Sequence, residues 1–369
     1  MKDKNIFIIG GHFTPAISIY KELNKHKIYN IYYVGVKHTI LFDKSFSQEY
    51  KYAKDNNIKF LSLNTGKLYR YLSINSIISF CKIPLGFIQS IYYILKYRPI
   101  SVISFGSYVS VPILIISKIF KIRIYTHIQT IKPGISDRIG IKYSEKIFTS
   151  WQETIKYIKN KNKIIYTGNI LRDEIFNTNS DYFKIDKKYP LIYITGGNQG
   201  AHIINTLIFQ NIEKLLKKYT LIHQIGSNSI YNDFEKSIEI KSKLDMNLKK
   251  RYINKKNIWG DRVGEVLNKS DLVIGRSGAN TVYEILSLSK KAIFIPLSIG
   301  DKFDQIYNAK IAQNYSNVVD LINENELNFN KLEKKIETLL NKRILKNTHT
   351  LPINAKKYIS DYIIKSVNK

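Results

Sequence analysis

The sequence is short of acidic residues, and the shortage is concentrated in one region. Of its 369 residues, 58 are Lys or Arg and 29 are Asp or Glu, which gives a formal net charge of +29. Residues 56–136 contain neither Asp nor Glu. Such a basic region favours an anionic partner, either nucleic acid or an anionic membrane surface. No basic stripe is interleaved with stacking aromatics as in known nucleic-acid modules, so we expect a membrane surface and no nucleic acid.

Cysteine is almost absent as well. Cys81 is the single cysteine, which excludes an internal disulfide and suits a reducing compartment. No Asp-x-Asp pair of carboxylates marks a metal site, and we predict neither a metal nor a cofactor. The opening residues MKDKNIFIIGG pass directly into an apolar run and a glycine turn, which does not resemble a cleavable signal.

The chain length suits two domains, and apolar runs alternate with helical patterns along both halves. This alternation predicts the α/β class with doubly wound parallel sheets. Thr14 followed by Pro15 indicates an N-cap and the start of a helix that runs to about residue 25. The predicted strands cover residues 5–9, 31–36, 58–63, 102–105, 123–127, 146–149 and 164–167, then 191–195, 220–225, 258–259, 272–274 and 292–295. The boundary is expected at residue 168.

The stretch YPLIYITGGNQGAHIINTLIF, residues 189–209, has the strongest local signal. An apolar strand is followed by the turn GGNQG and then by apolar residues at helical spacing. Glycines allow a phosphate to approach the backbone, and the first N–H groups of a helix attract an anion. An ordinary βα turn without a ligand remains the alternative reading.

A second stretch of the same kind lies about eighty residues later. In DLVIGRSGANTVYEI, residues 271–285, a strand is followed by a glycine-bearing turn and a helix that carries Glu284. A carboxylate there could accept hydrogen bonds from ribose hydroxyls. Two phosphate-type turns and one carboxylate predict a nucleotide-diphosphate site at the carboxyl ends of a parallel sheet.

Several motifs together resemble those of one enzyme family. GGNQGAHIIN, GRSGANTVYEI and DQIYNA resemble, in order and spacing, the donor-site motifs of the peptidoglycan N-acetylglucosaminyltransferases of glycosyltransferase family 28. GGHFTPA and GSYVSVP resemble the family's first glycine loops, HIQTIKPGISDR its acceptor loop and TGNILRDEI its interdomain segment. The resemblance implies a GT-B fold, in which two Rossmann-like domains face each other across a cleft. The expected domains are residues 1–167, joined by a closing helix at 353–369, and residues 168–352.

The resemblance also implies a reaction. An inverting transferase would move N-acetylglucosamine from UDP-GlcNAc to an undecaprenyl-diphosphate-linked N-acetylmuramyl-pentapeptide, at the cytoplasmic side of the inner membrane. The partners would be UDP-GlcNAc, a polyprenyl-diphosphate-linked acceptor and an anionic membrane surface. A related transferase with another lipid acceptor, a UDP-sugar 2-epimerase and a non-catalytic binding protein on this fold are the alternatives. Acidic catalytic residues that an epimerase would need are not evident.

The candidate site residues follow from the matched motifs. His12 is the expected base toward the acceptor hydroxyl, since its ordinary pKa lies near neutrality; capping of the turn or contact with phosphate is the alternative. The donor-binding candidates are Arg172, Gly196, Gly197, Asn198, Gln199, Gly200, Trp259, Arg276, Ser277, Gly278, Glu284, Asp304 and Gln305. The acceptor-binding candidates are Gly10, Gly11, His12, Thr14, Tyr108, His127 and Gln129.

Three of these candidates have structural alternatives. Arg276 could equally be a surface or strand-end residue, Asp304 could cap a helix, and the Trp259 side chain could belong to the core. The acceptor loop also departs from the family pattern, because Ile128 and Thr130 stand where Glu and Asn are usual. The donor motifs therefore follow the family pattern more closely than the acceptor motifs do.

Residues 74–95 form a further apolar stretch, interrupted by Lys82 and Pro84. Its uninterrupted length is below the ~20 residues that a membrane-spanning helix needs. Basic flanks favour a helix that lies on an anionic leaflet, and two helices packed on the first sheet are the alternative. These flanking residues are Lys67, Arg70, Lys82, Lys96 and Arg98.

Overall fold

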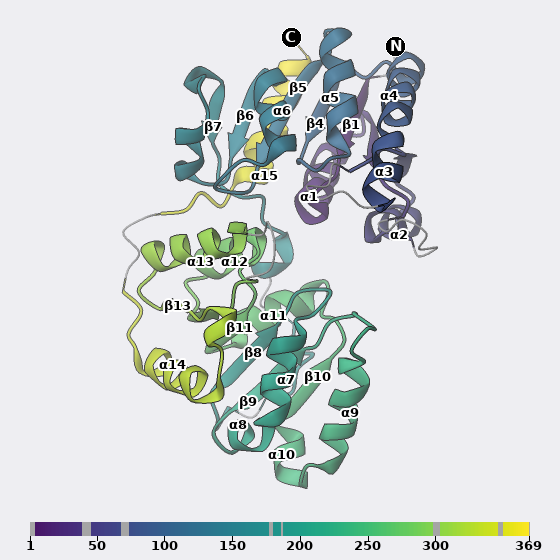
Figure 1. Cartoon of the computed structure of the whole chain (residues 1–369). Helices are drawn as coiled ribbons and strands as arrows, with labels where there is room; N and C mark the ends of the chain where they lie inside the picture. The colour runs from purple at the N-terminus through teal and green to yellow at the C-terminus, as the bar shows by residue number, and fades with distance from the viewer. Residues whose placement is uncertain are drawn as a thin grey trace. The chain divides into compact units, whose positions relative to one another are not determined.

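The structure is a computed structural model, shown in Figure 1. It describes residues 4–38, 46–67, 74–176, 180–185, 187–297, 303–345 and 350–368. The chain forms two compact units, of which unit 1 comprises Met1–Arg172 with Pro352–Lys369 and unit 2 comprises Asp173–Leu351.

Unit 1 is built on a seven-stranded parallel sheet in the order β3-β2-β1-β4-β5-β6-β7. Its central strands β1 and β4 are rich in β-branched residues and fully buried, as in a parallel sheet covered by helices on both faces. The strand bounds are β1 Asn5–Ile9, β2 Asn30–Gly35, β3 Lys59–Ser62, β4 Ser101–Ser104, β5 Arg123–Ile128, β6 Lys146–Thr149 and β7 Ile164–Tyr166.

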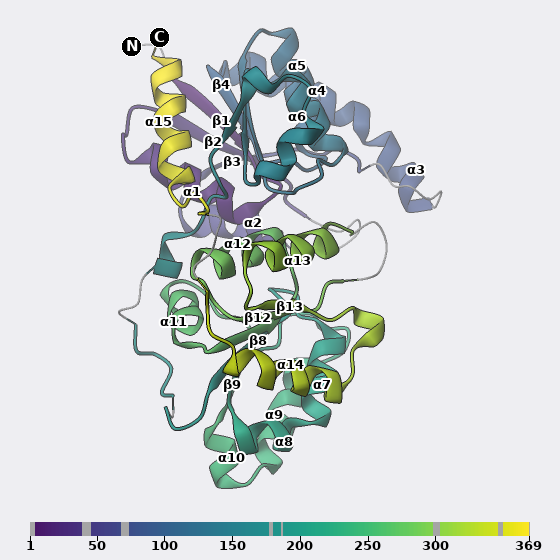
Figure 2. The same cartoon turned by 90° about the vertical axis from the view of Figure 1, so that its left-hand side faces the viewer.

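Helices cover both faces of this sheet and bury two separate apolar clusters. One cluster joins β1 to α1 and to the last helix, α15, and the other joins β1 to α4 and α5. Figure 2 shows α15 beside α1, although the two are more than 300 residues apart in sequence. The helices are α1 Phe13–Asn24, α2 Gln48–Asp55, α3 Ile74–Cys81, α4 Ile83–Tyr97, α5 Ser110–Ile119, α6 Ile135–Tyr143 and α15 Ala355–Val367, with short 3-10 turns at Gln152–Tyr157 and Lys161–Lys163.

Unit 2 is built on a six-stranded parallel sheet in the order β10-β9-β8-β11-β12-β13. Its strands are β8 Leu191–Thr195, β9 Thr220–Gln224, β10 Tyr252–Lys255, β11 Leu272–Gly275, β12 Ala292–Phe294 and β13 Val319–Leu321. Its helices are α7 His202–Gln210, α8 Ile212–Lys218, α9 Asp233–Lys243, α10 Met246–Lys250, α11 Asp261–Lys269, α12 Ala279–Ser287, α13 Phe303–Tyr315 and α14 Phe329–Asn341, with 3-10 turns at Asp173–Phe176 and Glu324–Glu326.

The predicted α/β class with two doubly wound parallel sheets is confirmed. The predicted strand at residues 258–259 is wrong, because the edge strand is β10, a few residues earlier. Strand β10 lies at the edge of the sheet, is half-exposed and contains a lysine. It therefore lacks the apolar pattern of a central strand. The three-residue strand β13 was not predicted.

Two other predictions need adjustment. Helix α1 starts earlier than expected, with His12 rather than Thr14 at the N-cap, because the Ala16 N–H already donates to the His12 carbonyl. The segment after residue 167 belongs to unit 1: Ile170 is buried in its core, and the Gly168 N–H donates to the Thr149 carbonyl. The units therefore divide between Arg172 and Asp173, a few residues after the expected boundary.

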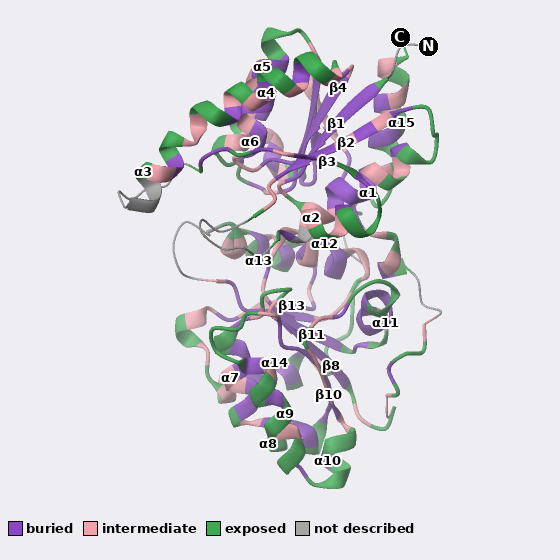
Figure 3. Cartoon of the chain, turned by 90° about the vertical axis from the view of Figure 1, so that its right-hand side faces the viewer, coloured by how far each residue is buried: buried purple, intermediate pink, exposed green. Residues whose placement is uncertain are grey.

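The stretch at residues 74–95 forms two helices, α3 and α4, separated at Lys82. Figure 3 shows that buried and exposed residues alternate along α4. Gly86, Ser90 and Ile94 face the protein. Among the described side chains of the two helices, seven large apolar ones are exposed, namely Ile77, Phe80, Leu85, Ile88, Ile91, Tyr92 and Leu95. The flanking Arg70 lies outside the described residues.

Candidate active site

The turn between β8 and α7 has the geometry of a phosphate loop. Gly197 and Gly200 have backbone φ angles of +79° and +82°, which residues with a side chain rarely adopt. A β-carbon on Gly200 would lie 2.0 Å from the Ile225 carbonyl oxygen. The predicted residues Gly196, Gly197, Asn198, Gln199 and Gly200 thus form one tight turn immediately before the N-terminus of α7. This is where a helix attracts an anion.

The last residue of β9 and the residues that follow it hold this turn from the adjacent strand. The Ser227 N–H donates to the Asn198 carbonyl over 2.9 Å, and the Asn228 N–H donates to the Gln199 carbonyl over 3.1 Å. The Gln224 amide donates to the Gly197 carbonyl over 3.1 Å. The orientations of three peptide groups in the turn are therefore fixed.

This supporting segment, residues 223–228, was not predicted from the sequence. Its available signal is Gly226, which follows an apolar strand directly and has φ of +99°. A β-carbon there would lie 2.2 Å from the Gly200 nitrogen, so the two glycine backbones are in direct contact.

The second glycine turn lies beside the first one. Strand β11 pairs with β8, so that Gly275 is opposite Thr195, and the Arg276 N–H donates to the Thr195 carbonyl. Gly278 is the N-cap of α12. Two helix N-termini, those of α7 and α12, thus follow neighbouring strands at the same edge of the sheet.

The side chains around the second turn are largely engaged within the protein. The Arg276 guanidinium donates to the Ile295 carbonyl and forms an ion pair with Glu324 at 2.5 Å, both side chains being mostly buried. The Ser277 hydroxyl donates to the Gln305 carbonyl, and the Gln305 side-chain oxygen accepts from the Leu297 N–H. Arg276 therefore joins the turn to the segment after β13.

Three other donor candidates have different environments. Glu284 is buried at 4% exposure on α12. Asp304 is exposed in the first turn of α13. Trp259 is half-exposed in the loop between β10 and α11, so its side chain does not belong to the core.

In unit 1 the predicted acceptor loops converge at the carboxyl ends of β1 and β4. A β-carbon on Gly11 would lie 2.4 Å from the Ser107 β-carbon, so the turn with Gly10 and Gly11 packs on the loop that carries Tyr108. His12 caps α1 without a side-chain capping bond and is exposed. The surrounding protein nevertheless disfavours a charged ring and lowers the pKa of His12. Thr14 lies within the first turn of α1.

The acceptor loop contains buried polar groups that lack partners. Burial lowers the pKa of His127 to about 4, so its imidazole is neutral. Its Nε2 lies 3.2 Å from the Gly168 carbonyl, whereas Nδ1 and both amide atoms of Gln129 have no hydrogen-bond partner among the described residues. Buried polar atoms normally have partners, so this loop has hydrogen-bonding capacity for a ligand.

The two departures from the family pattern have clear positions. Ile128 is fully buried against Ile147 and Ile158. Thr130 donates from its hydroxyl to the Lys132 carbonyl. Neither side chain replaces the hydrogen-bonding capacity of the usual Glu and Asn. Arg172 is half-buried at the end of unit 1.

The described part of the chain contains no group of three or more His, Cys, Asp or Glu side chains that could hold a metal ion. A depression of about 1200 Å³ lies in unit 2 beside Tyr189 and Leu191, at the amino end of the sheet. Ligands of parallel α/β sheets bind at the opposite edge, where both glycine turns lie.

Comparison with known proteins identifies the family. The model of the glycosyltransferase family 28 N-terminal domain matches residues 9–149, and that of the family's C-terminal domain matches residues 191–361. The chain belongs to glycosyltransferase family 28. The N-terminal model falls within unit 1, and the C-terminal model covers most of unit 2 and extends into α15.

Two relatives carry the name UDP-N-acetylglucosamine–N-acetylmuramyl-(pentapeptide) pyrophosphoryl-undecaprenol N-acetylglucosamine transferase. The protein from Borrelia garinii is 33% identical, with 95% of this chain and 90% of the relative covered. The protein from Clostridium tetani is 32% identical, with 98% and 93% covered. These similarities extend over both units.

Solved structures agree on the fold. The crystal structure of Acinetobacter baumannii MurG has a TM-score of 0.70 at 19% identity and covers 98% of this chain and 99% of that one. A putative UDP-N-acetylglucosamine 2-epimerase from Listeria monocytogenes has a TM-score of 0.64 at 13% identity, with 99% and 96% covered. This family-28 glycosyltransferase thus has a GT-B fold with two Rossmann-like domains. Since the epimerase shares that fold, the fold alone does not select the reaction.

Proposed function

We propose that this enzyme transfers N-acetylglucosamine from UDP-GlcNAc to an undecaprenyl-diphosphate-linked N-acetylmuramyl-pentapeptide, with inversion at the sugar carbon. Family membership and the names of the relatives over nearly the whole chain support this reaction. The acceptor hydroxyl forms the new bond to the sugar carbon, and UDP leaves with the electrons of the broken carbon–oxygen bond.

The observation that carries the proposal is the pair of glycine turns on β8 and β11. These strands are hydrogen-bonded neighbours, and each turn leads into a helix N-terminus. Two converging helix N-termini supply positive partial charge for the leaving diphosphate without a metal ion. Glu284, on the second helix, would accept hydrogen bonds from the ribose hydroxyls.

The remaining donor candidates have distinct proposed roles. Trp259 would contact the uracil through its backbone, and Arg172 would reach the diphosphate or the sugar. The Gln305 side chain would hydrogen-bond the sugar through its nitrogen, because its oxygen accepts from Leu297. Asp304 would bind a sugar hydroxyl. Arg276 would keep the second turn in place through Glu324.

His12 is the proposed base. It lies on a glycine turn that packs against the second acceptor loop, and its lowered pKa favours the neutral imidazole that can accept a proton. The unpartnered atoms of His127 and Gln129 would bind the acceptor.

A lipid-linked acceptor requires the enzyme to reach a membrane, and we propose that α3 and α4 lie on its anionic cytoplasmic leaflet. By length and composition alone, Ile77–Tyr97 is one helical stretch among the described residues that could cross a membrane. The separation at Lys82 and the packing of Gly86, Ser90 and Ile94 favour helices parallel to the surface.

A cavity of about 470 Å³ adjoins these helices. It is lined by Ile83 and Phe87 of α4, by Tyr108 of the glycine loop GSYVSVP and by Lys67. The cavity therefore extends from the exposed apolar helices to the loop that packs against the turn of His12.

The decisive experiment is turnover of radiolabelled UDP-GlcNAc with a panel of lipid acceptors. We expect a labelled disaccharide product with the undecaprenyl-diphosphate muramyl-pentapeptide. Turnover with a diacylglycerol or another polyprenyl-linked sugar, and none with the muramyl acceptor, would establish a related transferase instead. UDP-GlcNAc epimerisation without any acceptor would contradict the proposal altogether.

Donor binding has its own test. We expect calorimetry to show UDP binding in EDTA, with weaker binding for Glu284→Ala. Binding that requires a divalent cation, or an unchanged Glu284→Ala variant, would contradict the proposed donor site.

A further inference from the structure

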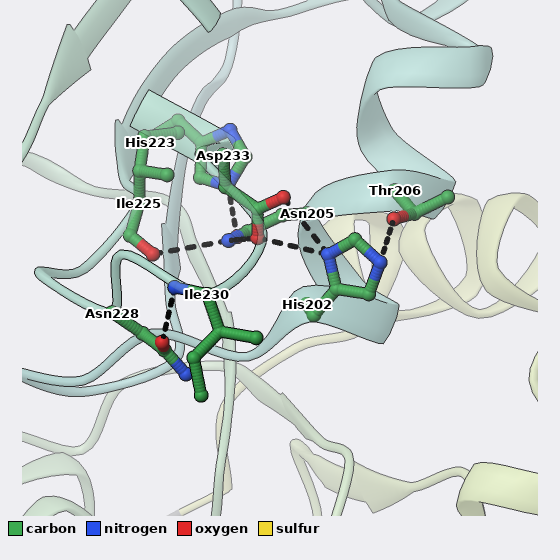
Figure 4. A network of polar contacts seen from close by, with 8 residues as sticks. All are labelled: His202, Asn205, Thr206, His223, Ile225, Asn228, Ile230 and Asp233. Carbon is green, nitrogen blue, oxygen red and sulfur yellow. Dashed lines mark hydrogen bonds and ion pairs between the residues drawn. The ribbon is translucent and has the colours of Figure 1, made fainter. Parts of the chain in front are cut away.

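A chain of hydrogen-bonded polar side chains joins His202, at the start of α7, to the end of β9 and the start of α9 (Figure 4). His202, the first residue of α7, has Nδ1 2.8 Å from an Asp233 carboxylate oxygen. Asn205, one turn later, has its amide nitrogen 2.8 Å from the same carboxylate and 3.0 Å from the Ile225 carbonyl. The side-chain oxygen of Asn205 lies 3.0 Å from Nε2 of His223.

The direction of these hydrogen bonds is fixed. The Asp233 carboxylate and the Ile225 carbonyl only accept, so the Asn205 amide nitrogen faces them and its oxygen accepts from His223 Nε2. Burial lowers the pKa of His223 to about 3, so its ring is neutral and Nδ1 accepts from the Tyr252 hydroxyl. The chain of hydrogen bonds therefore runs from Tyr252 in the core to the Asp233 carboxylate. This carboxylate also accepts a hydrogen bond from His202 at the surface.

This chain of hydrogen bonds contacts the backbone segment that supports the donor turn. Asn205 holds the Ile225 carbonyl, and that carbonyl lies against Gly200. The next residues, Gly226, Ser227 and Asn228, are those whose backbone contacts and hydrogen bonds orient the turn. Asp233 is the first residue of α9, and the segment that leads to it stacks Tyr231 on the His202 ring, with centroids 3.8 Å apart.

We propose that His202, Asp233 and Asn205 are positioning residues for the diphosphate of the donor, and that they hold the glycine turn through the Ile225 carbonyl. The inference rests on the proposed function. None of the three is required to touch the substrate. Because they fix peptide groups before the donor binds, their loss raises the KM for UDP-GlcNAc more than it lowers kcat.

Two substitutions at His202 separate its contacts. His202→Asn keeps an amide nitrogen near the position of Nδ1 and can donate to Asp233. His202→Phe keeps the ring that stacks on Tyr231 and loses the donor. If the hydrogen-bond chain positions the turn, His202→Phe raises the Kd for UDP and the KM for UDP-GlcNAc about tenfold, whereas His202→Asn stays within about threefold.

A second pair of variants controls for charge. Asp233→Asn removes the carboxylate of the chain, and Glu235→Gln removes an exposed carboxylate in the same first turn of α9. We expect about a tenfold rise in KM for Asp233→Asn and none for Glu235→Gln. Because Asp233 is buried, the half-exposed His202 carries the test if Asp233→Asn fails to fold.

Each outcome has a definite meaning. Unchanged Kd and KM with a lowered melting temperature, or equal effects of His202→Asn and His202→Phe, would overturn the positioning role. In either case, turnover by the wild-type enzyme would leave the proposed function intact. A wild-type enzyme that binds no UDP would overturn the proposed function and this inference with it.

Discussion

The Ile225 carbonyl oxygen occupies the space that a side chain on Gly200 would need, only 2.0 Å from the position of its β-carbon. Residues from two neighbouring strand ends thus fit together only if position 200 is glycine. Gly197 has the same left-handed backbone but no atom within 4 Å of that position.

This difference gives a matched pair of substitutions. Gly197→Ala should lower the free energy of unfolding by about 1–2 kcal/mol, which is the cost of the left-handed conformation for alanine. Gly200→Ala should lower the melting temperature further and weaken UDP binding, because the backbone must move. Differential scanning calorimetry and UDP titration measure both effects. Equal effects of the two variants would contradict the described contact.

Substitution of His12 tests the base. His12→Ala should lower kcat by about 10²–10⁴-fold while the Kd for UDP hardly changes, because proton transfer is lost and the donor turns remain. Equal losses of turnover and UDP affinity would instead indicate a phosphate-binding or structural role.

The pKa of His12 also predicts a pH profile. Because the pKa of His12 is lowered, its ring stays neutral at pH values below 6.5, the ordinary pKa of histidine. The decrease of kcat/KM in acid should therefore begin below pH 6.5. Initial rates between pH 5 and 8 measure this limb. If kcat/KM of the wild-type enzyme already decreases at pH values above 6.5, and this decrease is absent in His12→Asn, the pKa of His12 is not lowered.

Two buried histidines should make the folded protein sensitive to acid. Burial holds the pKa of His127 at about 4 and that of His223 at about 3, whereas both are near 6.5 in the unfolded chain. Below pH 6.5 the unfolded chain therefore binds more protons, and stability falls by about 1.4 kcal/mol per pH unit for each histidine until the folded pKa is reached.

Urea unfolding between pH 7 and 5 measures this loss. His127→Gln can still donate to the Gly168 carbonyl but cannot titrate in this range, so the pH dependence should become shallower. His26, which is exposed after the end of α1, offers the same His-to-Gln substitution at a surface position as a control variant. A slope unaffected by His127→Gln would show that His127 is not held neutral.

Charge reversal tests the proposed membrane surface. Changing Lys82, Lys96 and Arg98 to Glu should release the enzyme from anionic vesicles, since each basic residue contributes about 1 kcal/mol near an anionic leaflet. UDP binding should persist. High salt should release the wild-type protein only partly, because burial of the apolar side chains of α4 is not screened.

The matched control places the same reversal on exposed residues of unit 2, namely Lys236, Lys249 and Lys250. Vesicle sedimentation should show no release for this control. Release by both sets would mean that net charge alone governs binding, and no binding by the wild-type enzyme would exclude a lipid-linked acceptor.

The sequence predicted those elements whose signals are local. Buried parallel strands are continuous apolar runs, and glycine turns carry glycine because other residues cannot adopt their backbone, so both sheets and both donor turns were evident. The order of the family motifs connected these turns to a chemistry.

Features that depend on distant partners could not be predicted. Arg276 is paired with Glu324, which lies 48 residues away, and nothing near either residue indicates the other. The support of Gly200 by Ile225 and Gly226 depends on the pairing of β8 with β9. Strands β10 and β13 lie at the sheet edges, where half-exposed residues weaken the pattern.

The return of α15 to unit 1 has a consequence for synthesis of the chain. Ile359 and Ile363 complete the core beside α1, and the Ser366 hydroxyl lies 2.5 Å from the Tyr125 hydroxyl. Unit 2 is continuous in sequence, whereas unit 1 is completed only when α15, which follows unit 2 along the chain, has been translated. During that interval the apolar side of α1 lacks the cover of α15, so we expect the N-terminal half to expose apolar surface until α15 docks.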